Sequence, residues 1–466
     1  MIPIAMLCGW LCATMVDTPI ALHPRNPHYF EFRGKPTVLV TSGEHYGAVL
    51  NLDFDFLPYL DTLARHGFNQ TRTFSGTYRE VPGAFRIQNN TLAPKPNRYQ
   101  SPWKRVAEAT DNQPERFDLD AFDAAYFERL KSFVSEAGKR GIVVELVLFC
   151  PLYEENLWEV NPMNSRNNVN GVGDCPRDEV YTLKHPKLLE KQRAFVRKVV
   201  TELNGFDNLY YEICNEPYFG GVTLEWQERI AETIDETEEN LPNEHMIAQN
   251  IANEKMKVDR PVHPRVSLLN FHYADPAAAL ENQGLDRAIG DDETGFDGVG
   301  DRAYRSEAWL FLLAGGGLFS NLDYSFTPDH EDGTATVSDP TPGGGGETLR
   351  TQLAFLKRFL EGFAFVKMQP ATIQASGNAP EARMAVLAEP GEQYAIYLSQ
   401  GGGRTTIRFD MPRGRYRGAW FDPRTGRELK AVDLEHPGGA AAITAPDFKE
   451  DIALKLIADR RANDRP

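Results

Sequence analysis

One glutamate stands at the point where an apolar segment of the chain ends. The apolar run 208–213 leads through Cys214 into Asn215, Glu216 and Pro217. Proline cannot continue a central strand, because it has no N–H to donate. If the run is a strand of a parallel barrel, its carboxyl end faces the mouth where barrel enzymes carry out their chemistry. Glu216 is therefore a candidate catalytic carboxylate.

A second group of carboxylates ends another apolar segment. Asp291, Asp292 and Glu293 follow directly after Ile289 and Gly290. The two-residue period of a strand predicts that Asp291 and Glu293 lie on one face and Asp292 on the other. Two carboxylates across a cleft are what glycoside hydrolysis requires. One of them must hold a proton while the other stays ionised.

The elements that would position these residues alternate along the chain. Between about residues 36 and 330, short apolar or β-branched runs alternate with amphipathic stretches of helical spacing. The expected strands are 36–41, 67–74, 141–149, 208–213, 245–249, 266–273, 287–291 and 317–324. The expected helices are 54–66, 122–140, 188–204, 226–240, 304–314 and 349–365. Because parallel strands need crossover helices, this order predicts a (β/α)₈ TIM barrel.

An open, doubly wound sheet is the alternative to a closed barrel. Such sheets usually carry a glycine-rich phosphate turn after the first strand. Here the first strand leads into Ser42-Gly43-Glu44-His45, which is not that turn. The sequence therefore favours the barrel over a nucleotide-binding sheet.

The hydrophobic pattern of the sequence changes after Pro370. Short alternating runs follow, separated by turn sequences such as 422–426. This pattern predicts a small antiparallel β-sandwich over residues 371–466, packed against a catalytic barrel of residues 23–370. Residues 1–22 form an N-terminal extension whose apolar run resembles a signal peptide without its basic region. We expect a secreted or periplasmic protein, with the cytoplasm as the alternative.

Composition narrows the range of partners. The 466 residues include 50 Lys and Arg against 66 Asp and Glu, a net charge of −16. Nucleic-acid binding is disfavoured, because phosphate contacts need clustered cations. No segment is long and apolar enough to span a membrane. The five cysteines form no dense disulfide framework, no His-Glu-x-x-His metal motif occurs, and no cofactor is expected.

The order of these motifs resembles that of the clan A glycoside hydrolases, such as the relatives of family 5 cellulases. Asn215-Glu216-Pro217 matches the clan's ending of strand four, and Glu293-Thr294-Gly295 its ending of strand seven. Arg72 at strand two and Phe271-His272-Tyr273 at strand six also fit. The C-terminal part, with Trp420 to Gly426, looks like the small β-domain that follows apiosidase-like members.

The resemblance implies roles for four residues. Glu216 would be the general acid and base, and Glu293 the nucleophile of a retaining mechanism. Asn215 would bind the sugar 2-hydroxyl, a contact that strengthens in the transition state. Arg72 would keep Glu293 ionised, because a nearby cation lowers the pKa of a carboxyl group.

Further residues are candidates for binding a carbohydrate. They lie at the ends of strands one, six and eight, or on the long insert 151–184 where a ring could stack on a sugar. They are Glu44, His45, His272, Tyr273, Asp323, Tyr324 and Trp158. Asp323 and Tyr324 stand where the clan commonly has a tryptophan.

The sequence thus predicts a retaining glycoside hydrolase that cleaves O-glycosidic bonds in a poly- or oligosaccharide, with neither metal nor cofactor. A non-catalytic carbohydrate-binding protein on the same barrel is one alternative. A metal-dependent barrel hydrolase is the other.

Overall fold

A computed structural model describes residues 18–110, 113–372, 374–377, 383–399, 403 and 405–459. The predicted signal-like run, residues 1–16, therefore lies outside the described residues. The end of the extension is part of the fold, because the Ile20 N–H donates to the Asp207 carbonyl at 2.9 Å. A small antiparallel sheet follows, formed by β1 (Ala21–Leu22), β2 (Phe30–Phe32) and β3 (Lys35–Thr37).

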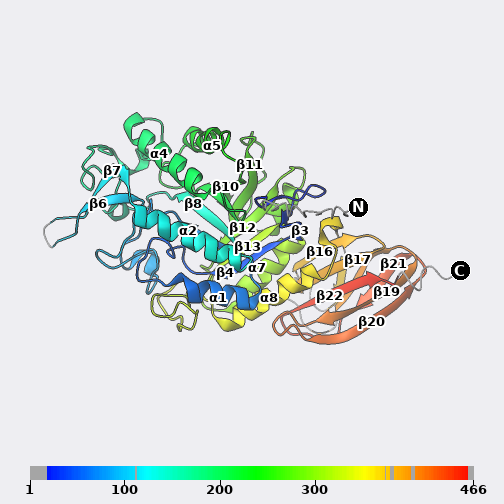
Figure 1. The fold of residues 1–466 in the computed structure, drawn as a ribbon. Coiled ribbons are helices and arrows are strands. Elements are labelled where there is room, and N and C mark those ends of the chain that lie inside the picture. The colour runs from blue at the N-terminus through cyan, green and yellow to red at the C-terminus, as the bar shows by residue number, and fades with distance from the viewer. Residues whose placement is uncertain are drawn as a thin grey trace, which may run out of the picture.

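Eight parallel strands form the predicted barrel (Figure 1). Their order around the sheet is β4-β13-β12-β11-β10-β9-β8-β5. They are β4 (Leu39–Gly43), β5 (Gln70–Phe74), β8 (Val143–Phe149), β9 (Leu209–Cys214), β10 (Ile247–Asn253), β11 (Val266–His272), β12 (Ala288–Thr294) and β13 (Leu318–Leu322). Between β4 and β5, the Phe74 N–H donates to the Tyr46 carbonyl at 2.9 Å. That bond draws the two edge strands together at the mouth.

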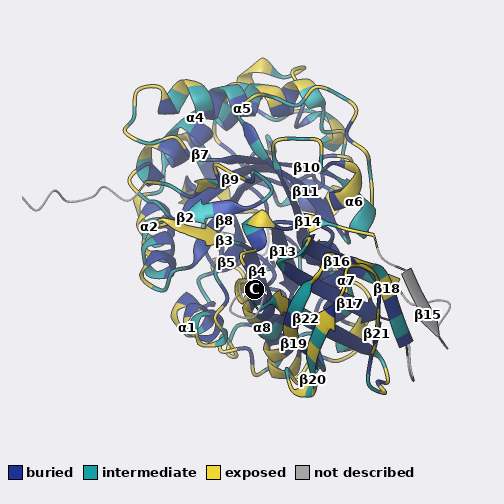
Figure 2. Ribbon diagram, turned by 90° about the vertical axis from the view of Figure 1, so that its right-hand side faces the viewer, coloured by how far each residue is buried: buried dark blue, intermediate teal, exposed yellow. Residues whose placement is uncertain are grey.

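Helices surround this sheet, as the sequence predicts. They are α1 (Phe56–His66), α2 (Ala124–Lys139), α4 (Pro186–Leu203), α5 (Leu224–Glu238), α7 (Asp301–Leu313) and α8 (Glu347–Glu361), with the short helices α3 (Glu155–Glu159) and α6 (Pro276–Glu281) not predicted. Local chemistry sets their ends. In α1 the Asp55 carboxylate accepts from the Leu57 N–H, and Gly67 ends the helix with φ 79°. Figure 2 shows the barrel strands buried inside this layer.

Two long inserts cover the mouth. The first insert lies between β5 and α2 and contains the antiparallel pair β6 (Trp103–Ala107) and β7 (Arg116–Phe122). The second, residues 151–184, is held by asparagine side chains that bind backbone carbonyls. Asn161 donates to Thr77 at 2.9 Å, and Asn168 to Asn164 at 2.8 Å. These bonds tie the second insert to itself and to the loop after β5.

The C-terminal part forms two antiparallel sheets, as predicted. The six-stranded sheet has the order β14-β16-β17-β22-β19-β20, and the three-stranded sheet β15-β18-β21. The strands are β14 (Gln369–Pro370), β15 (Gln374–Gly377), β16 (Arg383–Glu389), β17 (Gln393–Ser399), β18 (Thr405–Met411), β19 (Gly414–Phe421), β20 (Glu428–His436), β21 (Gly439–Thr444) and β22 (Asp451–Ala458). The larger sheet packs on α7, where Trp309 stacks on Tyr397 with ring centroids 5.1 Å apart. In the same contact, Arg305 binds Asp451 at 2.7 Å.

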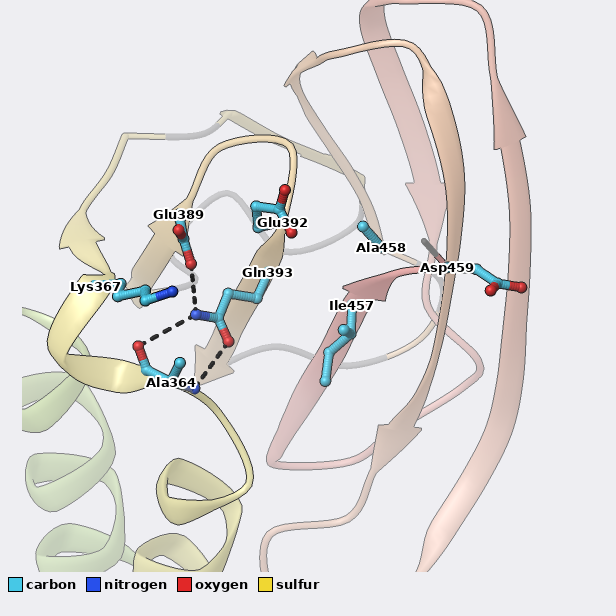
Figure 3. Close-up of a pocket in the computed structure, with 8 residues that line it drawn as sticks. All are labelled: Ala364, Lys367, Glu389, Glu392, Gln393, Ile457, Ala458 and Asp459. Atoms are coloured by element: carbon cyan, nitrogen blue, oxygen red, sulfur yellow. Dashed lines mark hydrogen bonds between the residues drawn. The ribbon is translucent and has the colours of Figure 1, made fainter. Parts of the chain in front are cut away.

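A groove of about 400 Å³ opens where the barrel meets the β-domain (Figure 3). Gln393 joins its two walls, donating to the Ala364 carbonyl at 3.2 Å and accepting from the Ala364 N–H at 3.0 Å. Ala364 follows the end of α8, whereas barrel helices begin at the mouth, so this groove lies away from the mouth. Among the described residues, no helix has both the length and the apolar character needed to cross a bilayer.

Candidate active site

A cavity of about 270 Å³ occupies the barrel mouth. Five residues singled out from the sequence line it: His45, Asn215, Glu216, Tyr273 and Glu293. They come from β4, β9, β11 and β12 or from the loops directly after them. The parallel register therefore brings together strand ends that lie far apart in the sequence.

Glu216 follows β9 with a strained backbone, at φ 34°. Its Oε2 accepts from the Tyr153 hydroxyl at 2.6 Å, and its Oε1 accepts from the Tyr218 hydroxyl at 3.2 Å. Tyr273, with φ 51°, is a second lining residue in the left-handed region. Positive φ at non-glycine residues costs free energy and concentrates at functional sites.

Glu293 lies on β12 with a different set of partners. Its Oε1 accepts from the Tyr273 hydroxyl at 3.0 Å, and its Oε2 from Arg72 Nη1 at 3.2 Å. The turn that follows needs Gly295, because a Cβ there would lie 2.6 Å from the Leu322 Cβ. The Glu-Thr-Gly spacing thus lets β12 end close beside β13.

The predicted alternation along β12 is wrong. Asp292 lies on the same side as Glu293, since both carboxylates bind Arg72, whereas Asp291 lies near Glu307. The pairing of β12 with β13 shifts register between Asp291 and Thr294. Such an irregularity breaks the two-residue period and re-aims side chains.

His272, at the end of β11, lies between three carboxylates. Its Nδ1 is 3.2 Å from Glu216 Oε1 and 3.5 Å from Glu293 Oε1. Its Nε2 is 3.4 Å from Asp292 Oδ1. The ring is fully buried and connects the two cavity carboxylates to the barrel interior.

Arg72, in β5, is the cation of this region. Its Nη2 donates to Glu212 at 2.6 Å and to the Asn215 carbonyl oxygen of the side chain at 2.7 Å. Its Nε lies 3.2 Å from Asp292, and its guanidinium stacks 4.6 Å above the Tyr46 ring centroid. Arg72 therefore fixes Asn215 and Glu293 together.

Beneath Arg72 lies a layer of three buried carboxylates, of which only Asp292 stands out in the sequence. Glu145, Glu212 and Asp292 have oxygens within 4.8 Å of one another. Burial and the neighbouring Glu212 raise the pKa of Glu145 to about 8. The same causes hold the pKa of Asp292 well above its ordinary range. Part of this layer is therefore protonated at neutral pH.

Glu216 has the opposite tendency. Burial acts to raise its pKa, but hydrogen bonds from His272, Tyr153 and Tyr218 outweigh burial and lower it. His45, in contrast, has its pKa lowered to about 4, because burial disfavours the charged ring. The cavity thus contains a carboxylate that favours ionisation and a neutral imidazole.

Six predicted binding residues do not line the cavity: Arg72 and His272, which bind its carboxylates from behind, Tyr324, and three whose polar atoms hold loops. Glu44 accepts from the Gly47 and Ala48 N–H groups, each at 2.9 Å. Asp323 binds Arg350 at 2.6 Å. The Trp158 indole donates to the Cys175 carbonyl at 3.1 Å. Each side chain anchors an insert or a turn near the mouth.

Tyr324 lies just behind the cavity wall. Its ring centroid is 5.9 Å from that of His45 and 6.4 Å from that of Phe296, both of which line the cavity. The predicted contact of Tyr324 with a ligand stays a prediction.

Aromatic side chains around the mouth are the main features that sequence reasoning missed. Among the described residues, the exposed large aromatics are Phe85, Tyr218, Phe219 and Phe296, exposed by 37% to 44%. Three of them line the cavity, and Tyr218 binds Glu216. Exposed apolar side chains gathered at one place mark a binding surface. The two aromatics directly after Pro217 were the available clue.

The types of side chain in the two carboxylate clusters would allow either of them to bind a cation. Glu216, His272 and Glu293 have ligand atoms within 4.8 Å of one another, as does the deeper layer. Donors already bind these oxygens, however: Tyr153, Tyr273 and Arg72 in the cavity, and Asn270 in the layer. The arrangement fits protonated and ionised carboxyl groups better than it fits a metal.

No protein-family model matches the chain, and no curated protein matches it. Solved structures do. A putative glycoside hydrolase from Bacteroides vulgatus ATCC 8482 superposes with a TM-score of 0.65 at 13% identity, covering 95% of this chain and 82% of that chain. A glycoside hydrolase family 5 structure from the same organism gives 0.62 at 12% identity, covering 95% and 94%. The fold is that of family 5 glycoside hydrolases. The expected clan A barrel is thereby confirmed as a fold.

Proposed function

We propose that the chain is a retaining glycoside hydrolase that cleaves O-glycosidic bonds in a poly- or oligosaccharide. The observation that carries this proposal is the closeness of Glu216 and Glu293. Their Oε1 atoms lie 3.2 and 3.5 Å from the same His272 nitrogen, and the cluster has carboxylate oxygens within 4.8 Å. Retaining enzymes hold their carboxyl groups about 5–5.5 Å apart, and inverting enzymes about 6.5–9.5 Å apart.

The two carboxylates have environments suited to different roles. Arg72 and Tyr273 each donate a hydrogen bond to Glu293 and so hold its carboxylate in place as the nucleophile that attacks the anomeric carbon. Glu216 would protonate the glycosidic oxygen and later deprotonate a water. Asn215 lies beside both, held by Arg72, and its amide would bind the sugar 2-hydroxyl.

The aromatic rim supports a carbohydrate as the ligand. Phe85 and Phe296 line both the inner cavity and an outer groove of about 510 Å³. A chain longer than one sugar would run from the carboxylates past these rings. Aromatic faces pack against flat apolar surfaces, which the C–H faces of sugar rings provide.

The test uses azide rescue of two alanine variants on an activated aryl glycoside. Glu216→Ala should form the glycosyl-enzyme and then stall, since no base activates water. Azide needs no base and should give a glycosyl azide of retained configuration. Glu293→Ala with azide should give the opposite anomer.

The control is Glu128→Ala, at an exposed position on α2, which should behave as wild type. Wild type is first screened on aryl glycosides and polysaccharides to find a substrate. Swapped anomers from the two variants would exchange the roles. Undiminished turnover by both variants on a natural substrate would refute the proposal, and binding without turnover by wild type would favour the non-catalytic alternative.

A further inference from the structure

A third carboxyl group lines the cavity, and the proposed mechanism does not use it. Glu80 lies on the first insert, and only 5% of the residue is exposed. Its Oε1 accepts from the Tyr78 hydroxyl at 3.1 Å, and its Oε2 accepts from the Asn90 amide. Among the described residues, no other donor binds this carboxyl group. A carboxylate has about four acceptor sites, so Glu80 has capacity left for a ligand.

Glu44, directly after β4, is a nearby carboxylate with a structural role. Its oxygens accept from the Gly47 and Ala48 N–H groups and also from the Thr91 hydroxyl, at 2.6 Å. It does not line the cavity. Glu80 differs on both counts, because it reaches the cavity and binds fewer protein donors.

Asn90 fixes the orientation of His45 beside Glu80. The Leu92 N–H donates to Asn90 Oδ1 at 2.8 Å, so the nitrogen of this amide is the atom that faces Glu80. Asn90 Oδ1 also lies 3.0 Å from His45 Nδ1. Since an amide oxygen can only accept, His45 Nδ1 carries a proton and donates it to Asn90.

The other ring nitrogen of His45 is an acceptor. Burial lowers the pKa of His45 to about 4, so the ring is neutral near pH 7. With its proton on Nδ1, the ring has a lone pair on Nε2. His45 lines the cavity, and among the described residues no group forms a hydrogen bond with Nε2. Glu80 and His45 Nε2, joined through Asn90, are called the acceptor pair below.

The acceptor pair lies deep in the cavity. Glu80 and His45 are exposed by 5% and 8%, whereas Phe85 and Phe296, which also line the outer groove, are exposed by 37% and 40%. A sugar that enters past these aromatic rings therefore loses water where the acceptors lie. Hydrogen bonds that form away from water discriminate strongly between ligands, because an unmatched polar group is left unpaired.

The loop between Glu80 and Asn90 is held in place without a ligand. The Glu80 N–H donates to the Leu92 carbonyl at 2.8 Å, and Phe85 and Asn89 have φ of 52° and 48°. Such strain at non-glycine residues persists only where the surroundings enforce it, and it concentrates at functional sites. Acceptors that are already in position lose little entropy on binding.

The ligand that fits these groups is a sugar without an acidic substituent. A sugar hydroxyl donates to a carboxylate or to His45 Nε2, and its oxygen can also accept from a protonated Glu80. Three carboxyl groups line the cavity, those of Glu80, Glu216 and Glu293, and its described lining includes neither lysine nor arginine. An acidic sugar would bury its charge there without a cation, which costs much free energy.

We infer that Glu80 is a specificity-determining residue, which together with His45 binds hydroxyl groups of the sugar nearest to Glu216 and Glu293 and excludes acidic sugars from that position. This inference rests on the proposed function, because it names the class of sugar that the same cavity receives. The sequence singled out His45 but not Glu80, since the path of the insert depends on tertiary contacts.

The first test measures binding and needs no turnover. Free aldohexoses and aldopentoses, and the uronic acids that match them, are titrated into wild type and Glu80→Gln and followed by NMR. At least one neutral aldose should bind wild type more tightly than its uronic acid does. Its dissociation constant should rise roughly ten- to hundredfold in Glu80→Gln, as expected for a hydrogen bond to a charged group. Glu80→Asp, which withdraws the carboxylate, should show the same loss and serves if Glu80→Gln does not fold.

Glu115→Gln is the matched control. Glu115 is a buried carboxylate on the same insert, but it binds Arg79 at 2.9 Å and Arg105 at 2.8 Å and does not line the cavity. This variant should bind sugars as wild type does. Wild-type affinity in a folded Glu80 variant, tighter binding of the uronic acid, or no binding of any aldose to wild type would overturn the inference.

The second test separates direct contact from a structural role of Glu80. Monodeoxy analogues of the bound aldose each lack one hydroxyl group, and at least one should bind wild type roughly ten- to hundredfold more weakly than the parent sugar. That analogue should lose no further affinity in Glu80→Gln, because both changes remove the same hydrogen bond. Additive losses for every analogue would refute the contact.

These measurements also distinguish the inference from the proposed function. The expected binding pattern in a protein that turns over no glycoside would refute the proposed function and support the acceptor pair. Turnover of a neutral glycoside with the same kcat/KM in Glu80→Gln as in wild type would do the reverse.

Discussion

Arg72 at the barrel mouth and Arg305 at the β-domain contact are both buried and both bind carboxylates, but their charge balance differs. Arg305 binds Asp451, which is buried, and Glu450, whose side chain is 36% exposed. Arg72 binds three buried carboxylates, Glu212, Asp292 and Glu293. Water can solvate the excess charge at the contact, whereas at the mouth only protons can compensate it. The first arrangement suits stability and the second suits proton chemistry.

Removing Arg72 should have the largest effect. Arg72→Met leaves buried carboxylates without their cation, a loss of about 3–5 kcal/mol. If that loss falls on the transition state, kcat/KM should drop by roughly 10²–10⁴-fold. Steady-state kinetics on an aryl glycoside measures the drop. Arg72→Lys keeps the charge but loses the planar fork. Its kcat/KM should therefore lie between that of wild type and that of Arg72→Met. Wild-type activity in Arg72→Met would remove Arg72 from the mechanism.

The same substitution at the contact should affect stability and spare catalysis. Arg305→Met should lower the free energy of unfolding by about 3–5 kcal/mol, because Asp451 is left buried and unpaired. Chemical denaturation of the full chain measures the change, and kcat/KM should stay constant. Arg417→Met serves as the control, since the Arg417 side chain is exposed and its ion pairs should contribute less than about 1 kcal/mol. A catalytic defect in folded Arg305→Met would contradict the separation.

Glu145→Gln should change how the melting temperature depends on pH, because it removes one of the carboxylates crowded around Arg72. Burial and Glu212 raise the pKa of Glu145 to about 8 in the folded protein, against 4.5 ordinarily. The folded state therefore binds this proton more tightly than the unfolded state does. The stability that the bound proton contributes is lost as pH rises from about 4.5 to about 8. Glutamine imitates the protonated form, so the melting temperature of the variant should decline less over this range. Exposed Glu128→Gln should follow wild type, and parallel curves for all three proteins would contradict the shift.

Tyr153→Phe should have a smaller effect, exerted on Glu216 and on Asn215, whose amide donates to the Tyr153 hydroxyl at 2.8 Å. The Tyr153 hydroxyl donates to Glu216 and lowers the pKa of that carboxyl group. Without this donor the pKa of Glu216 rises, so the alkaline limb of the kcat/KM profile should move to higher pH. A hydrogen bond to a charged group is worth about 1.5–3 kcal/mol, so the shift should be about one pH unit or more. Tyr218→Phe, which removes a longer bond of 3.2 Å, should shift the limb less.

Chelation should have no effect. The oxygens of both carboxylate clusters already bind protein donors, so catalysis by protonated and ionised carboxyl groups needs no ion. Activity after dialysis against EDTA, with and without added divalent cations, measures this. Activity that is lost on chelation and restored by a metal would favour the metal-dependent hydrolase instead.

The sequence predicted the barrel and its functional strand ends because buried parallel strands have a strong apolar signature that polar residues interrupt. Glu216, Glu293 and Arg72 follow from that rule. The orientation of Asp292 could not be predicted, since a register shift in β12 leaves no compositional mark. Tyr153 and Phe85 lie on inserts whose paths depend on tertiary contacts. Glu44 and Asp323 occupy the expected strand ends, yet their carboxylates bind loop donors that sequence spacing does not reveal.

The asparagine-rich insert 151–184 has a consequence for how a ligand would be received. Asn161 and Asn168 tie this insert to itself and to the neighbouring loop, and the insert carries Tyr153, which binds Glu216. A wall already held in one conformation loses little entropy on binding, so more of the contact energy remains as affinity. Since these bonds are made within the insert and to a neighbouring loop, and not to the barrel strands, other loops could replace this one without repacking the barrel. The mouth could thus change its preference for ligands while the strands that carry the chemistry stay the same.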